Sequence, residues 1–599
     1  MKNKARLEAE HFLNNEKQFH LGVLPTEQSN PKTSNIDRIF KAGVDEGLKN
    51  LLSVDYDVAK MASNVLTGNA FRKLVEAGVK CMNGNGKIIL SGCGATGRLS
   101  ILLESIWRRF FAETREKHPD IYEKINIYEN RVFSIMTGGD YALIRSVESF
   151  EDYAEFGRRQ ARKLGVTGND ILIAITEGGE TSSVLGTVDE AVDNGAEVFL
   201  LFNNPADILR EHIERSRKAI EDKRVTVLDL YCGPMAIAGS TRMQATTSEQ
   251  LVVGAALELI LTRILKDKLT GNERKILELN DLDYAEEFKR LLDQLNAPEN
   301  IAELVKTIRF EADIYRSKGL ITYFADNYLL DIFTDTTERA PTFMLPPFRK
   351  CNDLKSLPSW AFVKNPRYST PETWEHTLAR HPRCLDWNRE TYKQLGASEK
   401  ITANPPDLTY SELLKFLIGN EPDSSRKSRP GNAAMMVVSG TETAGKDFAA
   451  FTDSFKRAAV DYRQILSLVI GEKPRETKNA MAKKGESSVK SDFRLNISTS
   501  GSALRTIEHL AVKLALNTLS TATMIVMGRV AGNWMSWVEV SNKKLRDRGI
   551  RLISELCGVS YRDACYALHE TLVELEQMDS SDNAKPSPVQ HTIQKLRRK

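Results

Sequence analysis

The chain has 599 residues, of which 41% are hydrophobic and 27% charged, and its formal net charge is +3. These are ordinary values for a globular protein of two or more domains, and so small a net charge, spread over interleaved acidic and basic residues, argues against a nucleic-acid partner. The N-terminus has no apolar stretch of a secretion signal, and the longest apolar run, at 251–261, contains Glu258 and is too short to cross a bilayer. The seven cysteines have no CxxC spacing and the nine histidines no ligand pattern, so we expect a cytoplasmic protein without a membrane anchor, structural metal or cofactor.

Short apolar runs alternate with helical patterns between residues 88 and 230. The predicted strands cover 88–90, 131–136, 170–175, 197–202 and 224–230, and 182–194 is one of the helical patterns between them. Short strands with helical crossovers predict a parallel, doubly wound sheet flanked by helices on both faces. Ligands of such sheets bind beyond the carboxyl ends of the strands, so the loops directly after the strands are the candidate site.

The loop after the first predicted strand is rich in glycine. Gly92-Cys-Gly-Ala-Thr-Gly97 leads into a helical pattern that starts near Arg98. Such a loop directs backbone N–H groups and the positive end of a helix dipole at one point, which suits a phosphate. A tight turn without a ligand is one alternative, and a dinucleotide site is another, because Gly92-x-Gly94-x-x-Gly97 matches that fingerprint. The second predicted strand ends much later than the acidic residue that the fingerprint requires, which disfavours the dinucleotide site.

A second loop of glycines and hydroxyls follows the third predicted strand. Thr176-Glu-Gly-Gly-Glu-Thr181 again opens a helix, and in a doubly wound sheet it lies beside the first loop. Two such loops can hold one phosphate from two sides. Gly239-Ser-Thr-Arg242, after the fifth strand, adds a guanidinium suited to an anionic or hydroxyl-rich ligand. These residues predict a phosphorylated small molecule as the ligand.

Together with motifs elsewhere in the chain, the paired loops resemble the sugar isomerase (SIS) family of phosphosugar-binding domains. The further motifs are Thr26-Glu-Gln-Ser-Asn30, Gly138-Gly-Asp140, Val147-Glu-Ser-Phe-Glu-Asp152 and Ser541-Asn-Lys-Lys-Leu545. Within that family the chain resembles the N-acetylmuramic acid 6-phosphate etherases, which have one SIS domain, and the glucokinase regulatory protein, which has two in tandem.

The second half of the chain predicts a second SIS domain. Residues 319–324 repeat the first strand, 434–445 repeat the third strand with its loop, and 501–504 repeat the Gly239 segment. The second copy has Ala325-Asp-Asn-Tyr-Leu instead of the glycine loop, and because the added carboxylate would repel phosphate we expect one phosphate site per chain. Gly440 to Lys446 nearly spells a P-loop, but Asp447 stands where the magnesium-binding hydroxyl belongs, which disfavours nucleotide binding.

We therefore expect an α/β chain with two tandem SIS domains and a helical C-terminal cap. The expected parts are an N-terminal helical segment at 1–75, the first SIS domain at 76–268, a helical linker at 269–300, the second SIS domain at 301–545 with an insertion at about 345–405, and the cap with a flexible tail at 546–599. Residues 473–491 and 579–599 are expected to be polar and flexible.

The resemblance implies that an etherase of this type needs two carboxyl groups, a base for a C–H proton and an acid for the ether oxygen. Glu151 matches one of them. The first copy has Ile106 where the second belongs, and Glu104 cannot replace it because it lies about 200° away around the helix. The second copy carries the matching pattern Asp335-Thr-Thr-Glu338-Arg-Ala-Pro-Thr342, so Glu338 would reach the first domain's site if the domains pair like an SIS homodimer.

One composite site between the two domains follows from this pairing. Its expected catalytic residues are Glu151 and Glu338; for Glu338, an ordinary solvated helix position is the alternative. The expected substrate-binding residues come from the loops of the first domain and from one helix start in the second half: Gly94, Ala95, Thr96, Gly97, Thr176, Glu177, Gly178, Gly179, Thr181, Ser240, Arg242, Asn542 and Lys544.

Three functions stay open, and with them whether the chain is an enzyme. The tandem architecture with one degenerate copy favours a regulator that binds N-acetylmuramic acid 6-phosphate or a hexose phosphate and acts on a protein partner; glucokinase is not predicted, because its binding surface is not recognisable. The carboxylate pair favours an N-acetylmuramic acid 6-phosphate etherase, a carbon–oxygen lyase that releases D-lactate, although Ala95, Gln244 and Glu177 depart from that family's pattern. An aldose–ketose isomerase is weaker, since Gly179-Glu-Thr181 resembles its loop but no histidine falls at a motif position.

Overall fold

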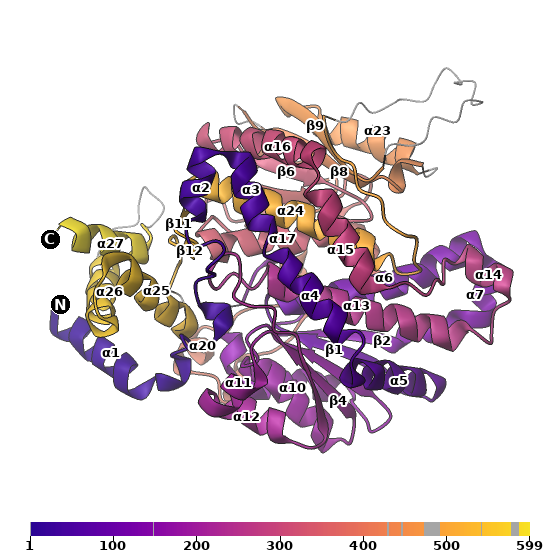
Figure 1. The fold of residues 1–599 in the computed structure, drawn as a ribbon, viewed down its shortest axis with the longest axis horizontal. Helices are drawn as coiled ribbons and strands as arrows, with labels where there is room; N and C mark the ends of the chain where they lie inside the picture. The colour runs from indigo at the N-terminus through magenta and orange to yellow at the C-terminus, as the bar shows by residue number, and fades with distance from the viewer. Residues whose placement is uncertain are drawn as a thin grey trace.

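The computed structural model describes residues 2–147, 149–427, 431–444, 447–472, 492–540, 542–576 and 586–598. Two five-stranded parallel sheets form its framework, one in each half of the chain, and they lie on either side of a layer of long helices (Figure 1). The flexible segment predicted at 473–491 lies outside the described residues, as do residues 577–585, which include the start of the predicted tail. Glu148, Ser541 and two positions of the near P-loop, Gly445 and Lys446, also lie outside them.

The first sheet has the strand order β2-β1-β3-β4-β5, and all its pairs are parallel. Its strands are β1 (Ile88–Gly92), β2 (Val132–Met136), β3 (Ile171–Ile175), β4 (Glu197–Phe202) and β5 (Val225–Asp229). All five predicted strands are confirmed, with ends displaced by a residue or two. The strand order reverses between β1 and β3, so the loops after these two strands meet at the switch point where doubly wound sheets bind ligands.

The second sheet repeats this topology with the order β10-β9-β8-β6-β7. Its strands are β6 (Ile321–Phe324), β7 (Ala361–Lys364), β8 (Ala433–Ser439), β9 (Gln464–Ile470) and β10 (Phe493–Leu495), all paired in parallel. Read from β7, the order matches that of the first sheet strand for strand. The tandem repeat of a doubly wound sheet is therefore confirmed.

The insertion predicted at about 345–405 is wrong in part, because it contains β7. This strand takes the place that β2 has in the first sheet, but a run of four residues is too short to show strand periodicity in a sequence. The irregular part lies between β7 and β8 and carries five short helices: α18 (Thr370–Leu378), α19 (Arg389–Gln394), α20 (Glu399–Ala403), α21 (Tyr410–Leu413) and α22 (Ser424–Lys427).

Helices cover both faces of the first sheet. They are α5 (Asn69–Asn83), α6 (Ala95–Lys117), α7 (Pro119–Ile125), α8 (Tyr141–Ile144), α9 (Ala154–Leu164), α10 (Ser182–Asp193), α11 (Ala206–His212), α12 (Glu214–Glu221) and α13 (Gln244–Leu265). The predicted helix at 182–194 is α10. The helix expected near Arg98 begins earlier, at Ala95, because Gly94 with a φ of 56° ends the loop.

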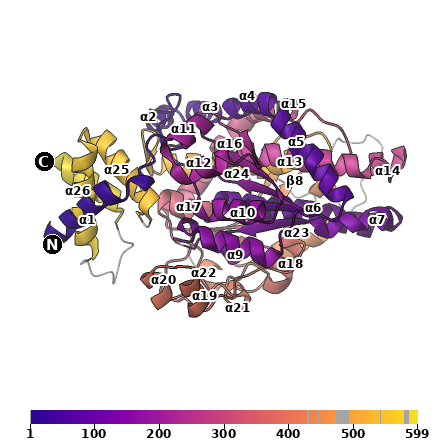
Figure 2. The same cartoon turned by 90° about the horizontal axis from the view of Figure 1, so that it is seen from below.

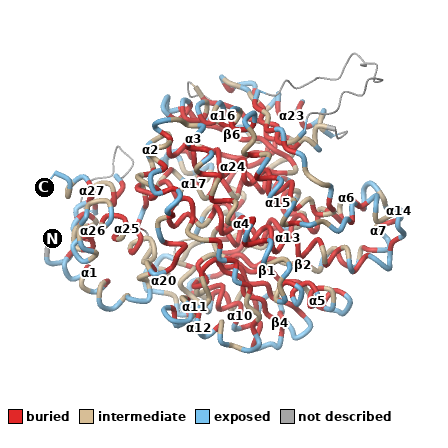
Figure 3. Tube along the Cα trace, in the orientation of Figure 1, coloured by how far each residue is buried: buried red, intermediate tan, exposed pale blue. Residues whose placement is uncertain are grey.

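The linker predicted at 269–300 contains α14 (Gly271–Ile276), which lies beside α7 (Figure 1), and α15 (Tyr284–Leu295). The helices around the second sheet are α16 (Pro298–Arg316), α17 (Leu329–Phe343), α23 (Phe448–Ala459) and α24 (Thr506–Val526). The helices α13, α17 and α24 run through the buried centre of the molecule (Figure 3). Among the described residues, α24 is the one helix long and apolar enough to cross a membrane, but 94% of its most apolar stretch is buried in this fold.

A helical cap stands beside the two sheets. It consists of α25 (Lys543–Cys557), α26 (Tyr561–Glu576) and α27 (Pro588–Arg598) and packs against α1 (Lys2–Asn15), so both ends of the described chain lie there (Figures 1 and 2). The flexible tail predicted at 579–599 is wrong for α27, because Val589 and Ile593, one helical turn apart, are buried in the cap core. The remaining N-terminal helices are α2 (Ile36–Ala42), α3 (Val44–Leu52) and α4 (Asp55–Val65).

Candidate functional site

A cavity of about 350 Å³ lies at the carboxyl end of the first sheet, within the range of small-molecule sites. Its wall combines the loops after β1, β2 and β3, the Gly239 segment, helix α17 of the second sheet and the start of α25. Ten of the predicted site residues line it: Gly94, Ala95, Glu151, Glu177, Thr181, Ser240, Arg242, Glu338, Asn542 and Lys544. The structure thus brings residues from both halves of the chain to one cavity.

Two uncapped helix N-termini face this cavity from adjacent loops. Helix α6 starts after Gly94 and helix α10 after Thr181, and neither has a side chain that accepts from its first N–H groups. A side chain added at Gly94 would meet no atom within 4 Å, so the loop leaves open space in front of α6. Because the first N–H groups of a helix lack partners inside the helix and carry the positive end of its dipole, the pair of loops is suited to an anion.

Five predicted binding residues do not line the cavity but shape its loops. The Thr96 hydroxyl accepts from the Cys93 N–H and donates to the Cys93 carbonyl oxygen, both at 2.9 Å. The Thr176 hydroxyl donates to that of Thr181 at 3.1 Å. The other three are glycines. A Cβ added at Gly97 would lie 2.6 Å from Met136, so this position needs a glycine. The Gly178 carbonyl accepts from Asn204, and Gly179 has a φ of 78°, which favours glycine.

Glu338 crosses from the second sheet's helix α17 to the first domain. It forms an ion pair with Arg98, whose side chain is completely buried in the first turn of α6, while the Glu338 side chain is 14% exposed. Arg98 also donates to the carbonyl oxygens of Ala142 and Leu143, at 3.0 Å each, and to the Ser146 hydroxyl at 3.2 Å. Glu338 is therefore not an ordinary solvated helix position.

The start of α25 reaches the same cavity from the cap. Asn542 donates to Glu151 Oε1 at 3.0 Å, and Lys544 donates to Glu180 Oε1 at 3.0 Å. One turn later Arg548 forms two hydrogen bonds, of 2.7 and 2.9 Å, with the buried Glu27. Glu27, Glu180 and Arg548 were absent from the predicted site, although Glu27 and Glu180 lie inside quoted motifs.

The carboxyl groups around the cavity have strongly different affinities for a proton. Burial raises the pKa of Glu151 to about 7, with Glu180 and Asp152 adding to the rise and Lys544 opposing it. Burial also raises the pKa of Glu177 to about 7, and the negative charges of Glu338 and Glu151 add to this. The pKa of Glu180 falls to about 2 in spite of its burial, because Lys544 and Arg215 stabilise the anion.

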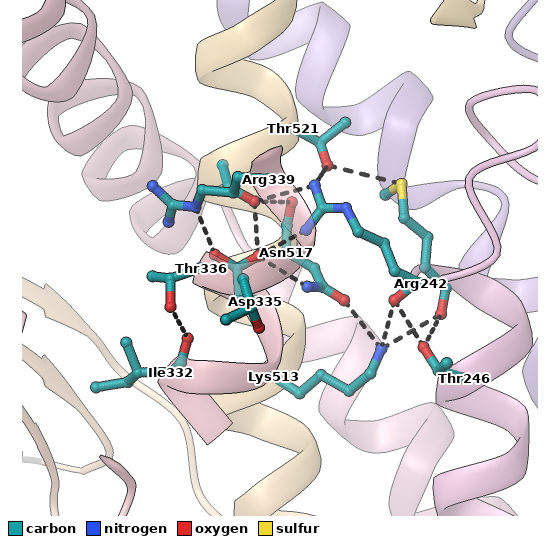
Figure 4. Close-up of polar contacts among 12 residues, drawn as sticks. Arg242, Thr246, Ile332, Asp335, Thr336, Arg339, Lys513, Asn517 and Thr521 are labelled. Atoms are coloured by element: carbon teal, nitrogen blue, oxygen red, sulfur yellow. Dashed lines mark hydrogen bonds and ion pairs between the residues drawn. The ribbon is translucent and has the colours of Figure 1, made fainter. Parts of the chain in front are cut away.

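Arg242 was expected beside the ligand, but its guanidinium is engaged with the second domain. It donates to Asp335 Oδ1 at 2.8 Å, to Thr521 at 2.9 Å and to Ser520 at 3.2 Å (Figure 4). Asp335 also pairs with Arg339 at 2.7 Å in the same buried network. The main effect of Arg242 in this structure is to join the two domains beneath the cavity.

Two other positions singled out in the sequence also lie off the cavity wall. Glu104 is buried and bonded to Arg108 at 2.9 Å and to Arg383 at 2.6 Å, as expected for a residue on the wrong side of its helix. Gln244, which departs from the etherase pattern, donates to Asp55 at 2.9 Å in the interior. Its departure from the pattern therefore places no different group against the ligand.

The corresponding loops of the second sheet are occupied by the protein's own carboxylates. Glu442 accepts from the Ser439 N–H at 2.8 Å and the Asn327 N–H at 3.4 Å, and Glu508 accepts from the Ser439 and Thr441 hydroxyls. Asp326, the carboxylate expected to repel phosphate, instead forms an ion pair with Arg367 at 2.7 Å and lies 2.8 Å from His376. The second copy therefore differs from the first mainly because its own carboxylates already accept from the loop N–H and hydroxyl groups, and less because Asp326 would repel a phosphate.

Comparison with known proteins gives consistent matches. A family model described as the glucokinase regulatory protein N-terminal SIS domain matches residues 71–192. N-acetylmuramic acid 6-phosphate etherase 1 of Bacillus licheniformis is 30% identical over 234 residues, which are 39% of this chain and 67% of that protein. The etherase of Clostridium acetobutylicum is 26% identical over 281 residues, 47% of this chain and 82% of that protein. Among solved structures, tagatose-6-phosphate ketose/aldose isomerase from Escherichia coli aligns with a TM-score of 0.41 and 10% identity, covering 82% of this chain and 94% of that chain.

Proposed function

The chain belongs to the family of the N-acetylmuramic acid 6-phosphate etherases and the glucokinase regulatory protein, and on this basis we propose that it binds a sugar phosphate in the composite cavity between its two sheets. The observation that carries the proposal is the pair of uncapped helix N-termini, α6 and α10, at the switch point of the first sheet. They supply the phosphate site, and the side chains of Glu151, Glu338 and Asn542 supply polar contacts for the sugar. No metal or cofactor is part of the proposal.

A regulatory role follows from where the cavity lies. Its wall includes the first sheet's loops, α17 of the second sheet and α25 of the cap, so a bound sugar phosphate contacts all three parts. A ligand can shift the equilibrium between two arrangements of such parts, and the shift equals the difference between its binding free energies for the two. A protein partner that recognises one pose would then respond to the sugar phosphate. The absence of disulfides among the seven cysteines supports a reduced compartment such as the cytoplasm.

Etherase activity is the second candidate, and the meeting of Glu151 and Glu338 in one cavity favours it. A carboxyl group with a pKa of about 7, as Glu151 has, is suited to give its proton to the ether oxygen as lactate leaves. In this proposal Glu338, which forms an ion pair with Arg98, accepts the C–H proton. The elimination breaks one C–H and one C–O bond and leaves a carbon–carbon double bond, to which water then adds. No histidine among the described residues lines the cavity, so nothing in its wall supports the isomerase.

One experiment separates these functions. The purified chain is incubated with N-acetylmuramic acid 6-phosphate while heat of binding and lactate are both measured. Lactate release that Glu151→Gln abolishes, and that the exposed control Glu155→Gln leaves unchanged, identifies an etherase. Binding without lactate identifies a sugar-phosphate sensor. If neither this compound nor a hexose phosphate binds, both functions are wrong.

A further inference from the structure

The cationic side chains around the cavity differ in whether they are available to a ligand. Five of them line it: Arg145, Arg242, Arg339, Lys544 and Arg548. Four already have carboxylate partners behind the cavity wall. Arg242 and Arg339 share Asp335 at 2.8 and 2.7 Å, Lys544 is 3.0 Å from Glu180, and Arg548 is 2.7 Å from Glu27. A ligand anion could use these four only in competition with buried ion pairs.

Arg145 is the exception. One N–H group of its guanidinium donates to the Phe348 carbonyl oxygen at 3.2 Å, and no carboxylate of the described residues forms an ion pair with it. A guanidinium has five N–H donors, so this bond leaves most of its capacity unused. Asp353 interacts with Arg145 only through its charge, without an ion pair. Among the cavity-lining cations in the described part of the chain, Arg145 is therefore the one whose donors no carboxylate occupies.

The position of Arg145 is fixed on both sides. Arg98 bonds to the two carbonyl groups just before it, of Ala142 and Leu143, and to the Ser146 hydroxyl just after it. Through the same Arg98 this segment is tied to Glu338, and through Phe348 it touches the chain that follows α17. A guanidinium held this way needs little reorganisation to bind a planar anion.

The phosphate and Arg145 belong to different parts of the cavity. The two helix N-termini come from the loops after β1 and β3, whereas Arg145 comes from the loop after β2, which lies on the far side of β1 from β3. Arg145 contacts the segment after α17 through the Phe348 carbonyl, and Leu345, Pro347 and Trp360 of that segment also line the wall. A sugar whose phosphate sits on the helix N-termini would thus turn its other end towards Arg145.

From these positions, and resting on the proposed sugar-phosphate function, we infer that Arg145 binds a carboxylate carried by the sugar at the end away from its phosphate. The planar fork of a guanidinium matches a carboxylate through two parallel hydrogen bonds. The other helix start in the wall, that of α25, is capped by the Asn542 side chain and does not offer its first N–H groups to a second phosphate in the way α6 and α10 do. The ligand class is a sugar phosphate with an acidic substituent on the ring. N-acetylmuramic acid 6-phosphate has such a substituent, and N-acetylglucosamine 6-phosphate is the same sugar without it.

The matched pair of sugars tests this inference on the full chain by calorimetry, or by KM where lactate is released. Arg145→Met is expected to weaken N-acetylmuramic acid 6-phosphate by roughly tenfold or more, the effect of a charged hydrogen bond, and to change N-acetylglucosamine 6-phosphate by less than about twofold. Arg145→Lys keeps the charge without the fork and is expected to lie between. Arg109→Met is the control, because Arg109 also donates to a backbone carbonyl, that of Asn327, but lines a different cavity.

Retained binding of N-acetylglucosamine 6-phosphate shows that a variant is folded. If Arg145→Met unfolds, Arg145→Gln, which keeps a donor for the Phe348 carbonyl, replaces it. Equal losses for both sugars, or no loss for either, would overturn the inference while leaving the proposed function intact. A wild-type chain that binds a hexose phosphate but neither of these two sugars would overturn the inference alone, and a wild-type chain that binds no sugar phosphate would contradict the proposed function as well.

Discussion

Replacing Glu177 by glutamine is expected to strengthen the binding of a sugar phosphate, and to do so only at alkaline pH. Glu177 lies in the loop between β3 and α10 and lines the cavity beside the proposed phosphate site. Burial and the charges of Glu338 and Glu151 hold its pKa at about 7. A bound phosphate dianion adds another negative charge and raises this pKa further, so binding takes up a proton wherever Glu177 was ionised before.

The size of the effect follows from that pKa. At pH 8, one unit above the pKa of about 7, placing a proton on Glu177 costs about 1.4 kcal/mol, which is a tenfold loss of affinity. At pH 6 the group is already protonated and the cost is close to zero. Glutamine carries no charge at either pH. The Glu177→Gln variant should therefore bind about tenfold more tightly than the wild type at pH 8 and within twofold of it at pH 6.

Calorimetric titration of N-acetylglucosamine 6-phosphate at both pH values measures this ratio. Because the same ligand is used with both proteins, the titration of its own phosphate cancels. Glu180→Gln, in the same loop, is the control: Lys544 and Arg215 hold the pKa of Glu180 near 2, so its effect should be the same at pH 6 and pH 8. A Glu177→Gln gain that is equal at both pH values, or no gain at pH 8, would refute the reasoning.

Two further predictions concern stability. Glu338→Gln leaves the fully buried guanidinium of Arg98 without its counter-charge, which should lower the free energy of unfolding by about 3 kcal/mol and the thermal midpoint with it. An unchanged midpoint would show that the ion pair does not join the domains. Gly157→Ala should destabilise the fold by about 3 kcal/mol, because the added Cβ would lie 1.8 Å from the Ser183 carbonyl oxygen between α9 and α10. Gly168→Ala is the control, since the nearest neighbour of its added Cβ is 3.5 Å away. Equal thermal midpoints for the two variants would contradict the expected clash.

The first sheet could be predicted from the sequence because each of its strands is a short apolar run that ends at a turn signal. The second sheet could be predicted only from repeats of the first. Its strand β7 has four residues and β10 three, and runs this short do not show the alternation of a strand. Helix α27 was missed for a related reason: Val589 and Ile593, its two residues in the cap core, stand in a mostly polar segment.

The site was predictable where function depends on local sequence. The glycine loops adjoin strands, and Glu338 was identified because residues 335–342 resemble an etherase pattern that the first copy lacks. The partners of these residues were not predictable, because they depend on how the two sheets and the cap pack. Arg98 and Glu338 are 240 positions apart, and Glu27 and Arg548 are 521 apart, so no spacing rule connects them. The engagement of Arg242 with Asp335 was missed in the same way.

A crystal structure of the chain with N-acetylglucosamine 6-phosphate tests the composite site most directly. The expected result is one sugar phosphate per chain, with its phosphate on the N-termini of α6 and α10 and its sugar in contact with α17 at Glu338 and with α25 at Asn542 or Lys544. A sugar phosphate that contacts only the first sheet, or that binds at the second sheet's loops beside Glu442 and Glu508, would contradict it.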